Sequence, residues 1–285
     1  MRSGVVGLMP ADLRAVTPQT AGRLRELGFT GVSCVMHDPF DYSQADLERV
    51  RSILADAGVR VAQANARYPD LIHPDASQRA AGLRALRQAC VAARWLQAAT
   101  VYVRPGSLNP AGSWTPHPDN THPRTLARLI ASLKTAAAAA ADLGVVLALE
   151  GHVVSSLDTP ERLREVLEAV GSPALRHNVD PVNMIGSLRD AYDSTAFLGR
   201  LFAVLGPFIV AAHAKDLRVE DRLVLHLQEC PIGEGLLDQV TFLQLFEAVC
   251  PDGYVMIEHL PDDQIPAAKR SLDAAAAQAG LTWQE

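Results

Sequence analysis

The stretch Val-Val-Leu-Ala-Leu-Glu (residues 145–150) is an apolar run that ends in a carboxylate, and three later stretches repeat this pattern. In chain order the four are VVLALE (145–150), LRHNVD (175–180), FIVAAH (208–213) and YVMIE (254–258). Short runs rich in Val, Ile and Leu are typical of parallel strands that are buried on both faces. The pattern predicts four such strands, whose last side chains meet at one edge.

Strand-like and helix-like segments alternate along the whole chain. The expected strands are Gly4–Met9, Gly31–Met36, Val59–Ala64, Thr100–Arg104, Val145–Glu150, Leu175–Asp180, Phe208–His213 and Tyr254–Glu258. The expected helices are Pro18–Leu27, Ser43–Ala57, Ser77–Leu96, Pro123–Leu143, Thr159–Val170, Ser194–Leu205, Asp238–Val249 and Asp263–Ala279. Eight such units predict an α/β fold, a single (β/α)₈ TIM barrel domain over residues 1–285. An open doubly wound sheet is the alternative, but no Gly-rich dinucleotide fingerprint follows the first strand.

Three long connections follow strands four, six and seven, at residues 105–122, 181–193 and 214–237. Active sites of these barrels are built from the loops that follow strands. The four terminal residues of the quoted stretches lie at the same ends. We therefore expect the active site at this rim of the barrel.

Composition narrows the class of protein. The chain has 285 residues, 48% of them apolar and 20% charged, with a formal net charge of −6. An acidic balance argues against a nucleic-acid partner, and no apolar stretch is long enough to span a membrane. Four cysteines lack CxxC spacing and no signal segment is recognised, so we expect free thiols and a cytoplasmic location.

The terminal residues of the four stretches are Glu150, Asp180, His213 and Glu258. Three carboxylates and one imidazole suit a hard or borderline divalent ion, Mn²⁺ or Mg²⁺ before Zn²⁺ or Cu²⁺. Any one of these residues taken alone is better explained as an isolated polar residue at a strand end. Four on consecutive strands favour a metal site, and hence an enzyme.

The second half of the chain resembles the xylose-isomerase-like barrels, which include sugar isomerases, ketose 3-epimerases, hydroxypyruvate isomerase and inosose dehydratase. The matching stretches are LALEGH (147–152), NVDPVN (178–183), HAKD (213–216), PIGEG with LLD (231–238) and MIEH (256–259). The resemblance implies that Glu150, Asp180, His213 and Glu258 bind a divalent metal, commonly Mn²⁺, with Mg²⁺, Co²⁺ or Zn²⁺ as alternatives. It also implies that Glu150 and Glu258 exchange substrate protons next to a carbonyl, through a metal-stabilised enediolate.

Two positions depart from the sugar 3-epimerase pattern. Those enzymes typically carry a histidine where this chain has Asn183, and a different motif where it has HAKD. The HxKD motif looks more like inosose dehydratase and the sugar phosphate isomerase/epimerase relatives. The departures leave open whether the reaction is an isomerisation, an epimerisation or an elimination.

Further candidates surround the expected site. His152 is a candidate acid/base or an exposed loop histidine, and Lys215 is a candidate for neutralising the enediolate, with Asp216 orienting it. The expected substrate-binding residues are Arg104, Asn183, His37, Asn65 and Asp216. We expect Glu234 to brace the PIGEG turn, while Trp114, His117 and His122 form either a lid or an ordered surface loop.

The leading hypothesis is therefore a metal-dependent isomerase or epimerase of a small sugar or keto-polyol, phosphorylated or free. The second is a lyase of the same family, such as an inosose-type dehydratase or a C-glycoside-cleaving subunit. A metal-dependent abasic-site endonuclease ranks low, because only His37 and His73 offer extra ligands in the first half. A non-enzymatic binding relative is the last alternative. Oligomers are common in this family, so a homo-oligomer is compatible with the sequence.

Overall fold

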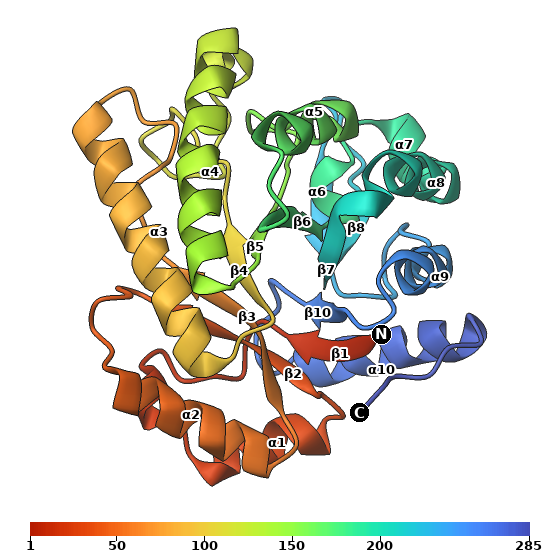
Figure 1. The fold of residues 1–285 in the computed structure, drawn as a ribbon. Coiled ribbons are helices and arrows are strands. Elements are labelled where there is room, and N and C mark those ends of the chain that lie inside the picture. The colour runs from red at the N-terminus through yellow and green to blue at the C-terminus, as the bar shows by residue number, and fades with distance from the viewer.

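The computed structural model describes all residues, 1–285, as a closed barrel of eight parallel strands surrounded by helices (Figure 1). The barrel strands are β1 (Arg2–Val5), β2 (Gly31–Met36), β3 (Arg60–Ala66), β4 (Thr100–Val103), β5 (Leu147–Leu149), β6 (Leu175–Val179), β7 (Ile209–Ala214) and β10 (Tyr254–Ile257). Their order around the barrel is β1-β10-β7-β6-β5-β4-β3-β2. The predicted TIM barrel is confirmed.

Eight helices follow the barrel strands and cover the outside of the barrel. They are α1 (Pro18–Glu26), α2 (Gln44–Asp56), α3 (Ala76–Leu96), α4 (Pro123–Leu143), α5 (Pro160–Val170), α8 (Ser194–Leu205), α9 (Gln239–Val249) and α10 (Ile265–Gln278). Local sequence sets several starts: Thr17 and Ser43 form capping boxes with Thr20 and Asp46, which satisfy the first free N–H groups. Gly144, with φ 64°, closes α4 in the left-handed conformation.

The core forms between the strands and the helices. Seventy buried residues make one continuous cluster there. A small separate cluster of Ala62, Tyr254 and Met256 fills the barrel interior. A Cβ on Gly31 would overlap the Tyr254 ring, so a glycine is needed where that ring packs against β2.

The first strand differs from its prediction, which placed it at Gly4–Met9. The strand is Arg2–Val5, and the ladder continues only to a bond from Val6 N to Ile257 O. Gly7 and Leu8 then take φ values of 146° and 60°, which turn the chain away from the barrel. The apolar character of Leu8 and Met9 comes from packing against the core rather than from strand pairing.

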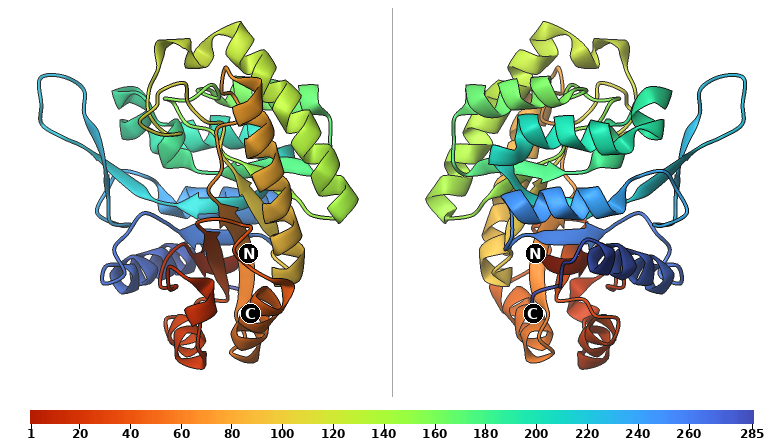
Figure 2. Two further views of the ribbon diagram at one scale, coloured as in Figure 1. Left: turned by 90° about the vertical axis from the view of Figure 1, so that its left-hand side faces the viewer. Right: turned by 90° about the vertical axis from the view of Figure 1, so that its right-hand side faces the viewer.

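The connections between the barrel strands and the eight helices carry additional structure that the sequence pattern did not predict. Short helical turns occur at η1 (Leu13–Ala15), η2 (Pro118–Thr121), α6 (Pro181–Met184), α7 (Leu188–Tyr192) and η3 (Gly206–Phe208). The 214–237 connection contains an antiparallel hairpin, β8 (Asp216–Val219) with β9 (Leu227–Cys230). This hairpin reaches outward from the barrel as a long arm (Figure 2).

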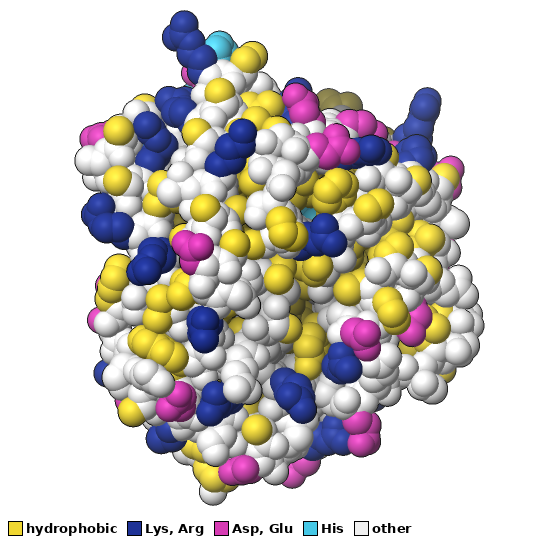
Figure 3. All heavy atoms as spheres, in the orientation of Figure 1, with side chains coloured by type: hydrophobic (Ala, Val, Ile, Leu, Met, Phe, Trp, Pro, Cys, Tyr) yellow, Lys and Arg dark blue, Asp and Glu magenta, His cyan; other side chains and the backbone are white.

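Other global features agree with the composition. The four cysteines are free thiols, as predicted. None of the helices combines the length and the apolar character that crossing a bilayer requires. Basic and acidic side chains are interspersed on the face drawn in Figure 3. The two termini lie close together, where Gln284 N donates to Met1 O at 2.9 Å.

Candidate active site

Four side chains from the ends of neighbouring barrel strands meet in one buried cluster. They are Glu150 after β5, Asp180 after β6, His213 in β7 and Glu258 after β10. One ligand atom of each lies within 4.8 Å of those of the other three. The strand-end pattern predicted this meeting point, because the carboxyl ends of parallel strands share one rim of a barrel.

The strand order places the two glutamates at opposite ends of an arc. Along β10-β7-β6-β5, Glu258 begins the arc and Glu150 ends it, with His213 and Asp180 between them. Strand alternation gives the direction: Ala212 and Ala214 belong to the helix-facing core, so His213 between them points into the barrel mouth. A ligand held at the centre of this arc has one glutamate on each side.

The imidazole of His213 sits between the two glutamates. Its Nδ1 lies 2.9 Å from Glu150 Oε1 and 3.0 Å from Glu258 Oε2. Burial lowers the pKa of His213, but the carboxylates of Glu258 and Glu150 outweigh burial and raise that pKa to about 10. Burial raises the pKa of Glu258, yet His213 and Lys215 together hold it well below its usual range. The cluster therefore has a strong affinity for positive charge.

Lys215 is the second cation of the cluster, two residues beyond His213 and on the same side of the chain. Its Nζ lies 2.9 Å from Asp180 Oδ2 and 3.2 Å from Glu258 Oε2, and it donates to Asn183 Oδ1 at 3.2 Å. Burial lowers the pKa of Lys215, but the charges of Asp180 and Glu258 more than offset burial and raise that pKa well above its usual value. Lys215 is thus a fixed ammonium inside the site, not a surface ion-pair partner.

A row of buried amides orients the cluster, and sequence reasoning missed it. His213 Nε2 donates to Gln63 Oε1 at 3.4 Å, in the tautomer that leaves Nδ1 free for a cation. Gln63 Nε2 donates to Asn178 Oδ1 at 3.4 Å, and Asn178 Nδ2 donates to Glu150 Oε1 at 3.1 Å. Tyr102 Oη donates to Glu150 Oε2. The available signal was strand alternation: Asn178 lies two residues before Asp180.

The donor set fits a divalent cation. Asp180 Oδ2 and Glu258 Oε2 are both buried and accept no hydrogen bond. Both lie close to Lys215 Nζ. A buried carboxylate oxygen that accepts no hydrogen bond costs free energy. A bound cation would offset this cost by adding positive charge beside that of Lys215. When an ion binds its ligands at about 2.1–2.4 Å, two ligand atoms on opposite sides of it are about 4.2–4.8 Å apart. The four ligand atoms here lie within 4.8 Å of one another, which fits this geometry. Glu150, Asp180, His213 and Glu258 would hold the ion.

Asp216 braces a turn instead of lining the site. Its Oδ2 accepts from Gly233 N and Gly235 N at 3.0 and 3.1 Å, and its Oδ1 accepts from Leu217 N and Leu237 N at 2.9 and 3.0 Å. Four backbone donors occupy the whole carboxylate, so the expectations that Asp216 binds substrate or orients Lys215 are not met. The bracing role expected of Glu234 falls to Asp216. Gly235 must be glycine, because a Cβ there would overlap the Asp216 carboxylate.

Arg104 also has a structural role in this conformation. Its Nη1 and Nη2 donate to Ala66 O and Tyr68 O at 3.0 and 3.2 Å, and its guanidinium lies 4.2 Å from the Tyr68 ring centroid. The side chain thus ties the end of β3 to the end of β4. His37 is exposed beyond β2, and Asn65 is half-buried in β3. Neither lines the cavity described next.

A cavity of about 740 Å³ opens beside the cluster. His152, Asn183 and Glu229 line its polar end, and two of these contact Lys215. Val154 N donates to His152 Nδ1 at 3.2 Å, so Nε2 is the nitrogen left for a ligand. Burial, and then the charge of Lys215, lower the pKa of His152. His152 and Asn183, which are predicted from the sequence to lie near the substrate, both line this cavity.

The 105–122 connection is an ordered wall beside this cavity. Trp114 stacks on His152 with ring centroids 5.6 Å apart, and Asn120 Nδ2 donates to Val154 O at 2.9 Å. His117 and His122 cap the starts of η2 and α4 through their Nδ1 atoms. Of the two predicted alternatives, these contacts favour an ordered loop over a lid.

The hairpin is connected to the cluster through Glu229, a residue that no sequence pattern pointed to. Glu229 Oε1 lies 3.5 Å from Lys215 Nζ, and both its oxygens lie 3.2 Å from His259 Nδ1. His259 follows Glu258 directly and has a left-handed φ of 60°, which is strained for a non-glycine residue. The Glu229 hydrogen bond raises the pKa of His259, with burial opposing. Glu229 thus connects the outer arm to the catalytic rim.

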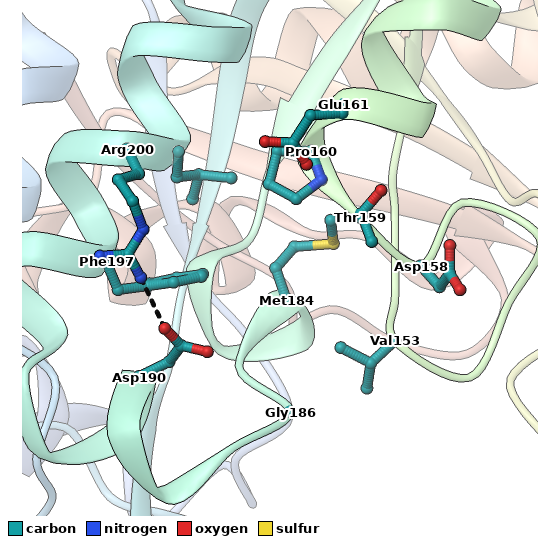
Figure 4. A pocket seen from close by; sticks show the side chains of 11 residues that line it. Val153, Asp158, Thr159, Pro160, Glu161, Met184, Gly186, Asp190, Phe197 and Arg200 are labelled. Atoms are coloured by element: carbon teal, nitrogen blue, oxygen red, sulfur yellow. Dashed lines mark hydrogen bonds and ion pairs between the residues drawn. The ribbon is translucent and has the colours of Figure 1, made fainter.

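A second cavity, of about 290 Å³, shares Val153 and Gly186 with the first and lies between α5, α7 and α8 (Figure 4). Three of its four charged lining residues are paired locally: Arg200 donates to Asp190 at 2.6 Å, and Asp158 accepts from Arg162 at 2.7 Å. None of the four clustered ligands lines it. The four ligands do not line the larger cavity either, but Asn183 and Glu229 in its lining contact Lys215, which connects that cavity to the cluster.

Several solved structures share this architecture. D-psicose 3-epimerase, solved in the presence of D-fructose, superposes with a TM-score of 0.76 at 18% identity, over 98% of this chain and 100% of that one. A xylose isomerase-like barrel protein from Mycobacterium smegmatis, in complex with magnesium, gives 0.72 at 16%, over 97% and 95%. A probable 3-DHS dehydratase from Bacillus anthracis gives 0.72 at 16%, over 96% and 98%.

At such low identity these likenesses establish the fold and not the reaction. A comparison with curated proteins finds no match by sequence. The family model described as xylose isomerase-like TIM barrel matches residues 22–283, nearly the whole chain. With a closed eight-stranded barrel and a matching family model, the chain belongs to the xylose isomerase-like TIM barrel family.

Proposed function

We propose that this protein is a divalent-metal-dependent isomerase or epimerase of a small sugar or keto-polyol. The observation that carries the proposal is the position of Glu150 and Glu258 at the two ends of the ligand arc. Two carboxylates that flank one bound substrate can exchange protons with opposite sides of a carbon atom. The neighbours that are epimerases and the family membership support the same class.

A divalent cation bound by the four ligands would polarise a substrate carbonyl, and so acidify the C–H of the adjacent hydroxyl-bearing carbon. In the proposed reaction one glutamate accepts that proton, and the other returns a proton to the opposite face or to the adjacent carbon. Tyr102 and Asn178 hold Glu150 in place for this transfer. The Lys215 ammonium offsets the negative charge that develops on the substrate oxygen. We expect Mn²⁺ as the ion, with Mg²⁺, Co²⁺ or Zn²⁺ as alternatives.

A lyase is the second candidate, and the surroundings of His152 favour it. Elimination starts with the same proton abstraction and then needs an acid that protonates the leaving group. His152 lines the cavity with Nε2 unbonded, and Lys215 is fixed nearby by Asn183. The Lys215 ammonium is the group placed to donate that proton, and His152 Nε2 is placed to hold the leaving group by a hydrogen bond. The endonuclease alternative is not supported, because His37 and His73 do not join the cluster.

Proton NMR in D₂O tests the proposal. The protein, loaded with Mg²⁺ to avoid paramagnetic broadening, is incubated with ketoses, aldoses, keto-inositols and hydroxypyruvate, and parallel Mn²⁺ incubations are read after the metal is removed. Deuterium entering next to a carbonyl, without loss of atoms, supports an isomerase or epimerase, whereas an alkene or enone product supports the lyase. Glu150→Gln and Glu258→Gln should each abolish exchange. The exposed Glu168 on α5 provides the matched control, Glu168→Gln, which should leave it unchanged. Exchange that survives both active-site variants refutes the proposed roles.

A further inference from the structure

The 740 Å³ cavity adjoins the cluster at Lys215, although none of the four candidate metal ligands lines it. Asn183 and Glu229 line it and lie 3.2 and 3.5 Å from Lys215 Nζ. A substrate whose reacting carbon lies between Glu150 and Glu258 therefore extends past Lys215 into this space. The volume is that of a pocket for a drug-sized ligand, well beyond the needs of a single sugar ring.

Half of the cavity lining is aliphatic, and the remaining wall includes the polar side chains of His226 and Gln228. Seven of its fourteen lining residues are apolar, and they come from three separate segments: Val153 and Val154 after β5, Val182 and Ile185 in and after α6, and Leu217, Leu225 and Leu227 of the hairpin. A free sugar carries hydroxyl groups on nearly every carbon, and each buried hydroxyl needs a hydrogen-bond partner. Aliphatic walls offer none, whereas they favour an apolar group that leaves water.

We propose that the substrate is a keto-sugar or keto-polyol that carries an aromatic or aliphatic substituent, with the substituent seated between the post-β5 loop, α6 and the β8–β9 hairpin. This inference rests on the proposed function for the reacting end, but it assigns the substrate class from the cavity alone. The hairpin is the specificity element, because it supplies Leu225 and Leu227 at the outer wall. Glu229, on the same strand as Leu227, holds that wall beside Lys215.

Ligand binding tests the inference without reliance on turnover. Phenyl β-D-glucopyranoside and methyl β-D-glucopyranoside differ only in the apolar group, and calorimetry of the Mg²⁺-loaded protein compares their affinities. We expect the phenyl compound to bind at least about tenfold more tightly, which corresponds to burial of a substituent of this size. Leu225→Asn should bring the ratio of affinities close to one, and Leu227→Asn provides a second lining variant if the first fails to fold.

The hairpin offers a matched control. Leu223 is fully exposed at its tip and does not line the cavity, so Leu223→Asn should preserve the ratio. A ratio near one in the wild type, or no binding of the phenyl compound, overturns the inference. So does a ratio that both lining variants leave intact. If instead Leu225→Asn changes only the mass measured by light scattering, the apolar wall receives a second copy of the chain, and the inference is wrong. None of these outcomes depends on proton exchange. The proposed function is tested separately, by deuterium exchange.

Discussion

Lys215 Nζ lies 2.9 Å from Asp180 Oδ2, so a protein ammonium and a candidate metal ligand are direct neighbours in a buried site. Two cationic groups, Lys215 and His213, stand among Glu150, Asp180, Glu229 and Glu258. The two cations offset the negative charge of these carboxylates inside the protein. It also makes the stability of the metal-free protein depend on the lysine.

Replacing Lys215 by Met should destabilise the metal-free protein by about 3–5 kcal/mol, because it leaves buried carboxylates without a counter-charge. Mn²⁺ should restore part of this loss, since a cation can supply the missing charge. Denaturant unfolding with and without Mn²⁺ measures both effects. The exposed Lys134 on α4 gives the control Lys134→Met, for which we expect a change within about 0.5 kcal/mol. Equal small losses for both variants would contradict the interpretation.

Binding of a divalent ion should raise the unfolding temperature, by an amount that grows with the logarithm of the ion concentration. An ion at 100 times its dissociation constant stabilises the folded state by about 2.7 kcal/mol, and a chelator removes that gain. Asp180→Asn should abolish most of the shift, because it removes one charged ligand. Asp142→Asn, at an exposed position on α4, should keep it. A shift that persists in Asp180→Asn would show that the ion binds elsewhere.

Gln63→Leu should weaken metal binding by about 10- to 100-fold, the usual effect of losing the group that orients a ligand histidine. The reason is that Gln63 Oε1 accepts the Nε2–H of His213. Metal titration followed by calorimetry measures the change, and Gln63→Glu, which keeps an acceptor, should recover binding. The exposed Gln78 provides the control Gln78→Leu. Unchanged affinity in Gln63→Leu would leave Gln63 with a packing role only.

His177 should make the fold sensitive to acid. Burial lowers its pKa to about 4, and the pKa in the unfolded chain is about 6.5, so folding favours the neutral ring. Its Nδ1 donates to Leu149 O at 2.8 Å, and its Nε2 is buried without a partner. The contribution of His177 to the free energy of unfolding is fully present above about pH 6.5. It falls by about 3 kcal/mol as the pH drops to 4.

The measurement is the free energy of unfolding between pH 4 and 7 for wild type and His177→Gln. Comparing the two slopes removes the contributions of the other titrating groups, including Asp180. The glutamine variant should show a flatter profile, while the exposed His73→Gln should follow the wild type. Parallel profiles for wild type and His177→Gln would be inconsistent with the buried neutral ring.

Local sequence patterns predict the barrel, and the residues at the strand ends predict where its functional rim lies. Runs such as VVLALE and FIVAAH are apolar on both faces, which only a sheet covered by helices satisfies, and helix caps such as Thr17 and Ser43 are read from neighbouring residues. Because parallel strands all end at one rim, the sequence alone predicts that the strand-end side chains lie close together. These are Glu150, Asp180, His213 and Glu258. Each of these inferences depends on local periodicity or on one rule of topology.

The residues that surround the four ligands follow from tertiary packing and cannot be predicted from local sequence. Gln63 and Tyr102 look like ordinary strand residues in sequence, and they join the site because β3 and β4 close the barrel onto it. Asp216 was expected in the pocket, but the Gly233–Gly235 turn folds back onto its carboxylate. The hairpin and its Glu229 contact depend on how a long loop packs, which no local periodicity encodes. Contacts between residues far apart in the chain follow from packing, and packing is settled only when the whole fold closes.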